Sequence, residues 1–152
     1  MTLQLVRFFG LLFVALALGP ALAHLLELPN KIRLPRDQYL AVQQLYRGWS
    51  RLGIIVIAAL LSTLALSLMV RGRDVEFAWA VAAFICVAST QVVFWAFTFP
   101  VNRETLNWTR LPENWAALRQ RWEYSHAVSA ALSFLALVSL IVSVLSAVSR
   151  PD

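Results

Sequence analysis

Four long runs of apolar residues constrain this chain more than any other feature of its sequence. They cover about residues 3–26, 52–70, 77–99 and 127–148. Each run is close to the roughly 20 residues that an α-helix needs to cross about 30 Å of hydrocarbon. Lipid offers no hydrogen-bond partners to the backbone, so a single spanning segment must be helical. We therefore expect four transmembrane helices.

The composition agrees with this expectation. Of the 152 residues, 60% are hydrophobic and 14% are charged, whereas soluble domains are about 45–50% apolar and about 25% charged. A soluble fold of this size cannot bury so much apolar surface. This excludes an ordinary cytosolic enzyme, a disordered tail and a fibrous repeat. The single cysteine, Cys86, excludes a disulfide scaffold and a cysteine-built zinc site.

The chain length fits one domain, residues 1–152. The polar turn at residues 71–76 is so short that the second and third helices must be antiparallel neighbours. We expect an all-α, integral membrane four-helix bundle of up-down topology. The first run also carries the pattern of a secretory signal, ending in Ala21-Leu22-Ala23. We expect it to be retained as a span, with a kink at Gly19-Pro20.

The two long connections, residues 27–51 and 100–125, lie on the same side of such a bundle. Each contains Arg-Leu-Pro followed by apolar residues at helical spacing. Proline is favoured in the first turn of a helix. We expect two amphipathic interfacial helices, one in each long loop. Their apolar stripes are Tyr39, Val42, Tyr46 and Trp49 in the first loop, and Trp115, Leu118 and Trp122 in the second.

Ionisable residues are paired in mirrored order at the long-loop side. His24 and Glu27 end the first span, and Glu123 and His126 begin the fourth. Residues three apart share a helix face. On antiparallel helices the order H-x-x-E against E-x-x-H puts the two histidines at one depth. We predict that His24 faces His126 inside the bundle, with Glu27 and Glu123 one turn nearer to water.

Three interpretations of these residues remain open. His24, Glu27, Glu123 and His126 are candidate ligands of a metal ion or of haem. Alternatively, each glutamate orients its own histidine for acid–base chemistry without a cofactor. In the third interpretation all four are ordinary side chains facing interfacial water. Gln91 and Asn102 are candidates for lining the same cavity or for hydrogen bonds between helices.

The charge pattern points to a membrane partner. The net charge is +5, and the two long loops carry nine of the 13 Lys and Arg residues. These cations flank spans and form no nucleic-acid patch, so we expect the lipid bilayer as a partner and no nucleic acid. The positive-inside rule places both long loops in the cytoplasm, in a bacterial inner membrane. No phosphate-binding glycine loop, G-x-S-x-G, CxxC or HExxH motif occurs.

Several segments resemble the anthrone-oxygenase-like family of small bacterial and fungal four-helix membrane proteins. They are Ala23–Lys31, Gln43–Trp49, Phe99–Arg103 and Arg119–His126. The most specific are P-x-N-R after the third span and R-W-E-x-x-H before the fourth. The resemblance implies oxidation of an anthrone to an anthraquinone by molecular oxygen, without a cofactor. It also implies Asn102, Arg103, Trp122 and His126 as site positions.

We therefore expect a small integral membrane oxidoreductase, oxygenase-like, that acts on a hydrophobic aromatic or quinone-type molecule. In this hypothesis His126 is the base or ligand and Glu123 orients it. Asn102, Arg103 and Trp122 complete the site. The alternative hypothesis is a non-catalytic accessory or assembly subunit of a larger membrane complex. Small residues along the fourth span then permit close approach of partner helices: Ser129, Ser133, Ser139 and Ser143.

Overall fold

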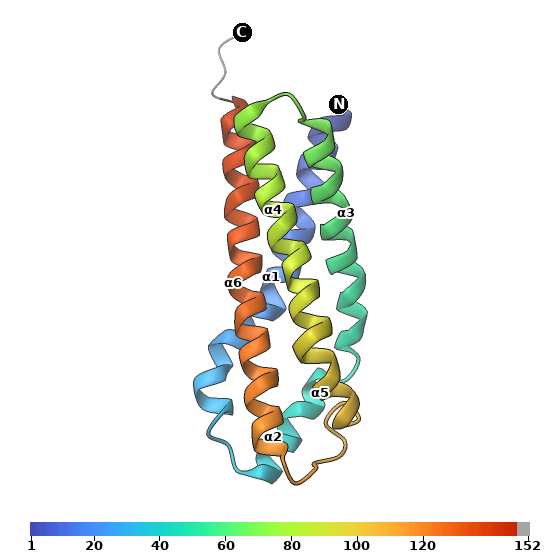
Figure 1. The fold of residues 1–152 in the computed structure, drawn as a ribbon, viewed down its shortest axis with the longest axis vertical. Coiled ribbons are helices and arrows are strands. Elements are labelled where there is room, and N and C mark those ends of the chain that lie inside the picture. Colours follow the sequence, from blue (N-terminus) through green and yellow to red (C-terminus); the bar gives the residue numbers. More distant parts are fainter. Residues whose placement is uncertain (149–152) are drawn as a thin grey trace.

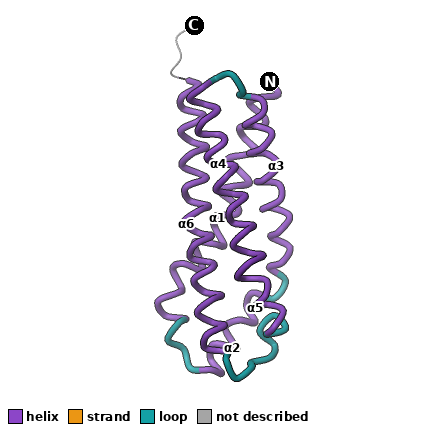
Figure 2. Tube along the Cα trace, in the orientation of Figure 1, coloured by secondary structure: helices purple, strands orange, loops and turns teal. Residues whose placement is uncertain are grey.

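The computed structural model describes residues 1–148, and this part of the chain is built of helices and turns without a strand (Figures 1 and 2). The four longest helices are α1 (Thr2–Lys31), α3 (Gly53–Met69), α4 (Asp74–Val93) and α6 (Trp115–Val148). Together with the short helices continuous with α3 and α4, they are long and apolar enough to cross a membrane. The predicted all-helical fold, with four helices long and apolar enough to span a membrane, is confirmed.

The four long helices pack in a ring. α1 contacts α3 and α6, and α4 contacts the same two helices. Figure 1 shows the N-terminus and the α3–α4 turn at one end of the molecule, and both long connections at the other. We call the latter the loop end. The membrane-depth core is filled mainly by small and branched side chains, including Val14, Ala59, Leu66, Ala83 and Leu140.

α4 continues towards the loop end through a π-helical turn, η3 (Phe94–Thr98), into α5 (Phe99–Glu104). Pro100 has no N–H, so it cannot donate to the carbonyl four residues earlier, that of Ala96. Arg121 of α6 donates to this carbonyl instead, with Nη2 2.6 Å from the oxygen. A second bond, 2.8 Å between the hydroxyls of Thr98 and Ser125, fastens the turn to α6.

The loop end differs from the expected pair of interfacial helices. The first long loop does form a helix, α2 (Arg36–Gln43), followed by the single 3-10 turns η1 (Gln44–Tyr46) and η2 (Trp49–Leu52). The second predicted helix is not separate, because Trp115 already begins α6, which continues into the fourth span. The two apolar stripes share a second core at the loop end, made of Tyr39, Val101, Trp108, Leu118 and Trp122.

The first span also ends later than predicted. α1 stays helical through Pro20 and Pro29 and ends at Lys31, five residues beyond the expected boundary. Residues three, four and seven apart lie on one face of a helix. The extra turn therefore places Lys31 on the same face as His24 and Glu27.

The serines of the fourth span lie within the bundle and not on its outer surface. Ser133, Ser139 and Ser143 are buried, and Ser143 donates to the backbone carbonyl of Glu76 on α4 at 2.9 Å. Ser129 and Ser133 line the cavity described below. The close helix approach that these small residues permit is thus used between helices of the same chain.

Candidate functional site

A cavity of about 670 Å³ runs through the loop-end half of the bundle. Side chains from α1, α3, α4 and α6 line it, together with residues of both long loops. Along α1 its lining extends from His24 to Val14, about 15 Å at 1.5 Å per residue. The deep part is apolar, with Val14, Ala59 and Val87, and polar groups gather near the loops. A cavity of this size and polarity suits a small hydrophobic molecule with a polar end.

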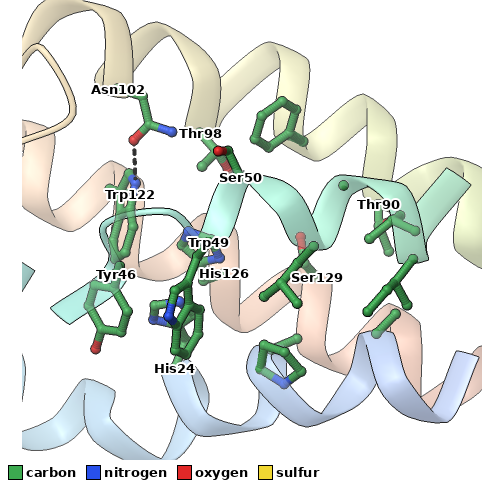
Figure 3. A pocket seen from close by; sticks show the side chains of 18 of the residues that line it. His24, Tyr46, Trp49, Ser50, Thr90, Thr98, Asn102, Trp122, His126 and Ser129 are labelled. Atoms are coloured by element: carbon green, nitrogen blue, oxygen red, sulfur yellow. Dashed lines mark hydrogen bonds between the residues drawn. The ribbon is translucent and has the colours of Figure 1, made fainter. Parts of the chain in front are cut away.

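The two histidines meet at the polar end of the cavity, as predicted. Their ring centroids are 4.3 Å apart with 25° between the ring planes, so the imidazoles stack. Figure 3 shows His24 reaching from α1 and His126 from α6, with Trp49 beside them. Trp122 also packs edge-on against both rings, at 5.1 Å from His24 and 4.2 Å from His126. Direct stacking leaves no room for a haem plane between the two rings.

Lys31 lies at the centre of a cluster of polar side chains at this end of the cavity. Its buried ammonium lies 3.4 Å from Nδ1 of His24 and 3.2 Å from Oε1 of Glu123. It also contacts Glu27 at 3.4 Å and the Tyr46 hydroxyl at 3.0 Å. An ammonium has only donors, so His24 Nδ1 must accept. Neutral His24 therefore carries its proton on Nε2.

Each glutamate bonds to a tyrosine and not to its own histidine. Glu123 is fully buried and accepts from the Tyr39 hydroxyl at 2.9 Å, while Tyr46 donates to Glu27. Burial raises the pKa of the Tyr39 hydroxyl, and the Glu123 carboxylate raises it further. Burial and the bond to Glu27 likewise raise the pKa of Tyr46. Both tyrosines therefore stay protonated donors at physiological pH.

These contacts do not favour the predicted metal site of His24, Glu27, Glu123 and His126. Among the described residues, no group of three or more His, Cys, Asp or Glu side chains is arranged to hold a metal ion. The physical reason is Lys31, whose ammonium contacts three of the four proposed ligands. A lysine cation thus occupies the position between carboxylates and imidazole that a metal ion would need.

The other predicted site positions divide between the cavity and the surface. Asn102 and Trp122 line the cavity and are joined by a hydrogen bond of 2.8 Å from the indole N–H to the amide oxygen (Figure 3). Gln91 lines it as well, one of the two roles considered for this residue. Arg103, the next residue of α5 after Asn102, is exposed and does not line the cavity.

A left-handed turn near the cavity was not anticipated. Leu106, Asn107 and Trp108 have φ values of 49°, 54° and 60°. This conformation costs a non-glycine residue about 1–2 kcal/mol. Hydrogen bonds stabilise the turn, including one of 2.7 Å from the Asn107 N–H to the Asn102 carbonyl. All three residues line the cavity.

Sequence reasoning missed Lys31, Tyr39 and Tyr46 as members of the site. The available signal for Lys31 was its spacing of four and seven residues from Glu27 and His24, had the helix been extended past Pro29. The helical spacing places Tyr39 and Tyr46 in an apolar stripe, but their hydroxyls donate to the two glutamates.

Comparisons of this chain with protein-family models, with curated proteins and with solved structures found no match. The resemblance to the anthrone-oxygenase-like family therefore stays a prediction from the quoted segments.

Proposed function

We propose that this protein is a small integral membrane oxidoreductase, oxygenase-like, that acts on a hydrophobic aromatic or quinone-type molecule. The observation that carries the proposal is the stacked His24–His126 pair at the polar end of a mostly apolar cavity. An apolar molecule can enter the deep part while its reactive end meets the imidazoles. Ionisable groups at membrane depth are costly, which favours a functional role for them.

The chemistry needs little more than a base. The CH2 group of an anthrone is acidic, and loss of its proton to an imidazole gives a carbanion that reacts with molecular oxygen. The overall change from CH2 to C=O consumes one O2 and releases one water. Within residues 1–148, Nε2 of His126 is buried and has no hydrogen-bond partner, so this ring is the better candidate for meeting the substrate. A positioned base contributes about 10²–10⁴ in rate.

The test uses the protein in lipid nanodiscs, anthrone as the probe and an oxygen electrode. We expect oxygen consumption above that of empty nanodiscs, and a loss of at least about 100-fold in His126→Gln. Tyr124→Phe is the matched control, since Tyr124 lies two residues away on α6 and is exposed. Consumption equal to that of empty nanodiscs would contradict the proposal.

For the membrane arrangement we propose an up-down bundle in a bacterial inner membrane with the loop end in the cytoplasm. Support comes from the nine Lys and Arg residues of the long loops, against four elsewhere in the chain. A periplasmic phosphatase fused to the C-terminus is then expected to be active. A cytoplasmic reporter that is active at the same position would reverse the assignment.

The alternative function, a non-catalytic accessory subunit, has less support. The hypothesis that small residues of the fourth span contact partner helices is weaker, because Ser133, Ser139 and Ser143 are buried within the bundle. Copurification separates the two hypotheses. A stoichiometric partner complex favours the accessory subunit, whereas a solitary protein that consumes oxygen favours the oxidoreductase.

A further inference from the structure

We propose that the polar end of the cavity contains a binding site for a carbonyl oxygen, formed by the N–H groups of Trp108 and Gln43. The ligand class is a flat apolar molecule that bears a ketone or quinone carbonyl. The inference rests on the proposed function in one respect, that the cavity holds an apolar molecule. It adds which chemical group of that molecule the protein recognises, and with which atoms.

Trp108 provides the first donor. Its side chain is 2% exposed and lines the cavity. In the part of the chain that the structure describes, its indole Nε1 has no hydrogen-bond partner. An indole nitrogen can only donate. A buried donor without a partner is unfavourable, so a group that supplies an acceptor at this point gains affinity.

The position of Trp108 is fixed by its backbone. The residue ends the left-handed turn, and its N–H donates to the Thr105 hydroxyl at 3.1 Å. Its carbonyl accepts from Gln44 Nε2 at 3.0 Å. Both backbone groups are thus occupied, while the side-chain donor is left unpaired. Residues in such strained conformations occur preferentially at functional sites.

Gln43 provides the second donor. It ends α2, is 4% exposed and also lines the cavity. Its amide lies close enough to the Tyr39 hydroxyl to affect that group. Over residues 1–148, Nε2 of Gln43 has no hydrogen-bond partner. The two unpaired donors come from different loops, yet Tyr39 is a shared neighbour, since its ring packs 5.0 Å from that of Trp108.

Trp108 and Gln43 both line the cavity and both contact Tyr39, and a pair of donors favours an acceptor with two lone pairs, which a carbonyl oxygen has. Trp122 packs against the rings of both Trp108 and His126, and His126 has a buried Nε2 without a partner in the described chain. An acidic C–H of the same ligand would meet His126 while its carbonyl meets Trp108 and Gln43. Preorganised donors of this kind also stabilise the negative charge that an enolate places on its oxygen. A hydrocarbon of the same shape would leave both donors unpaired.

The experiment compares 9-fluorenone with fluorene, which have the same rings but differ in a carbonyl or a CH2 group. Affinities are measured on the full-length protein in nanodiscs and corrected for partition into protein-free nanodiscs. We expect fluorenone to bind at least about tenfold more tightly. We expect Trp108→Phe and Gln43→Met each to weaken fluorenone binding about tenfold and to leave fluorene binding unchanged. Trp95→Phe is the control, because Trp95 is exposed on the outer surface.

Infrared spectroscopy gives a second readout that does not depend on affinity. A carbonyl that accepts hydrogen bonds absorbs at lower frequency, so bound fluorenone should be shifted downward and the shift should shrink in both variants. Equal binding of the two probes, equal weakening of both by the variants, or an unshifted carbonyl would each overturn the inference.

The outcomes also separate this inference from the proposed function. Discrimination between the probes without any oxygen consumption would support the carbonyl site and contradict the oxidoreductase. Oxygen consumption with anthrone that is unchanged in both variants would support the oxidoreductase and contradict the carbonyl site.

Discussion

The molecule buries ionic groups at both ends of the bundle, and the two clusters differ in how completely they are paired. At the end that holds the N-terminus, Arg7 of α1 bonds to Glu76 of α4 at 2.6 Å, and Arg73 approaches the same oxygen at 3.4 Å. At the loop end, Lys31 shares its charge between Glu27 and Glu123 at 3.2–3.4 Å. The first cluster is a tight ion pair in a packed core, and the second borders a cavity.

The unpaired atoms make the contrast sharper. Every buried side-chain nitrogen or oxygen found without a partner within residues 1–148 lies at the loop end. They belong to Gln43, Trp108, Arg119, Glu123 and His126. A fully paired buried cluster serves the fold, whereas unpaired polar atoms beside a cavity indicate a place for a ligand. We therefore expect the Arg7–Glu76 cluster to stabilise the fold and the loop end to bind a ligand.

The largest expected effect tests the structural end. Glu76→Gln leaves Arg7 as a buried charge without a carboxylate, and breaking such a pair costs about 3–5 kcal/mol. We expect a lower unfolding midpoint in detergent, with unchanged fluorenone affinity per folded protein. The double variant Arg7→Met with Glu76→Leu should recover most of the stability, because an apolar replacement of both partners is tolerated. A loss of fluorenone affinity in folded Glu76→Gln would contradict the separation of roles between the two ends of the bundle.

Lys31→Met tests the loop end and should cost less stability. Tyr39 and Tyr46 still donate to the two glutamates, so we expect a loss of about 1–3 kcal/mol. His24 Nδ1 loses its donor, and nitrogen-15 NMR should report a change from one imidazole tautomer to a mixture. Arg33→Met, an exposed position in the same loop, is the control. A loss as large as that of Glu76→Gln, with the His24 tautomer unchanged, would make Lys31 purely structural.

Asn102→Ala should have a smaller effect on stability than on binding. The change removes the acceptor of the Trp122 indole, which costs about 1 kcal/mol. Because both residues line the cavity, we expect the affinity for fluorenone to fall while most of the protein stays folded. Asn114→Ala is the matched control, since Asn114 is exposed and the one hydrogen bond of its side chain in the described chain is to the exposed Glu104. Equal losses of folded protein and of binding would make Asn102 structural.

The smallest expected effect concerns pH. Ionisation of Tyr39 and Tyr46 should not change the free energy of unfolding below about pH 10. The raised pKa values of Tyr39 and Tyr46 mean that neither ionises between pH 6 and about 10, where a free tyrosine titrates. Above about pH 10 the unfolded chain releases phenolic protons that the folded chain retains, so the free energy of unfolding should then fall. Ultraviolet titration of the folded protein up to pH 10 should show no tyrosinate from Tyr39 or Tyr46. Two or three tyrosinates in folded protein would contradict the buried bonds.

The sequence predicts the spans because apolar run length and membrane thickness leave few alternatives. It also predicts that His24 meets His126, because helical spacing fixes the face and antiparallel packing fixes the depth. The same rules applied beyond Pro29 would have found Lys31. They fail there because proline usually indicates a helix boundary, while α1 continues for two residues after it.

The remaining features of the site depend on contacts between segments far apart in the chain. Trp108 reaches the cavity through three left-handed residues, none of them glycine, so the local sequence carries only the weak signal of Asn107 for the turn. The Tyr39–Glu123 bond joins residues 84 positions apart. Arg103 illustrates the opposite case, because a motif position carried over from a resemblance is exposed and does not line the cavity.

The π-helical turn at Phe94–Thr98 sets the direction, around the helix axis, in which the residues after it point. An α-helix advances by about 100° per residue, so positions spaced by four drift steadily round its axis. Within the wider turn this drift is offset, and Phe94, Thr98 and Asn102 all line the cavity although they are spaced by four. Deleting one residue from this turn would rotate Asn102 and the left-handed turn by about 100°. The polar end of the cavity thus depends on the count of residues in one turn as much as on their identities.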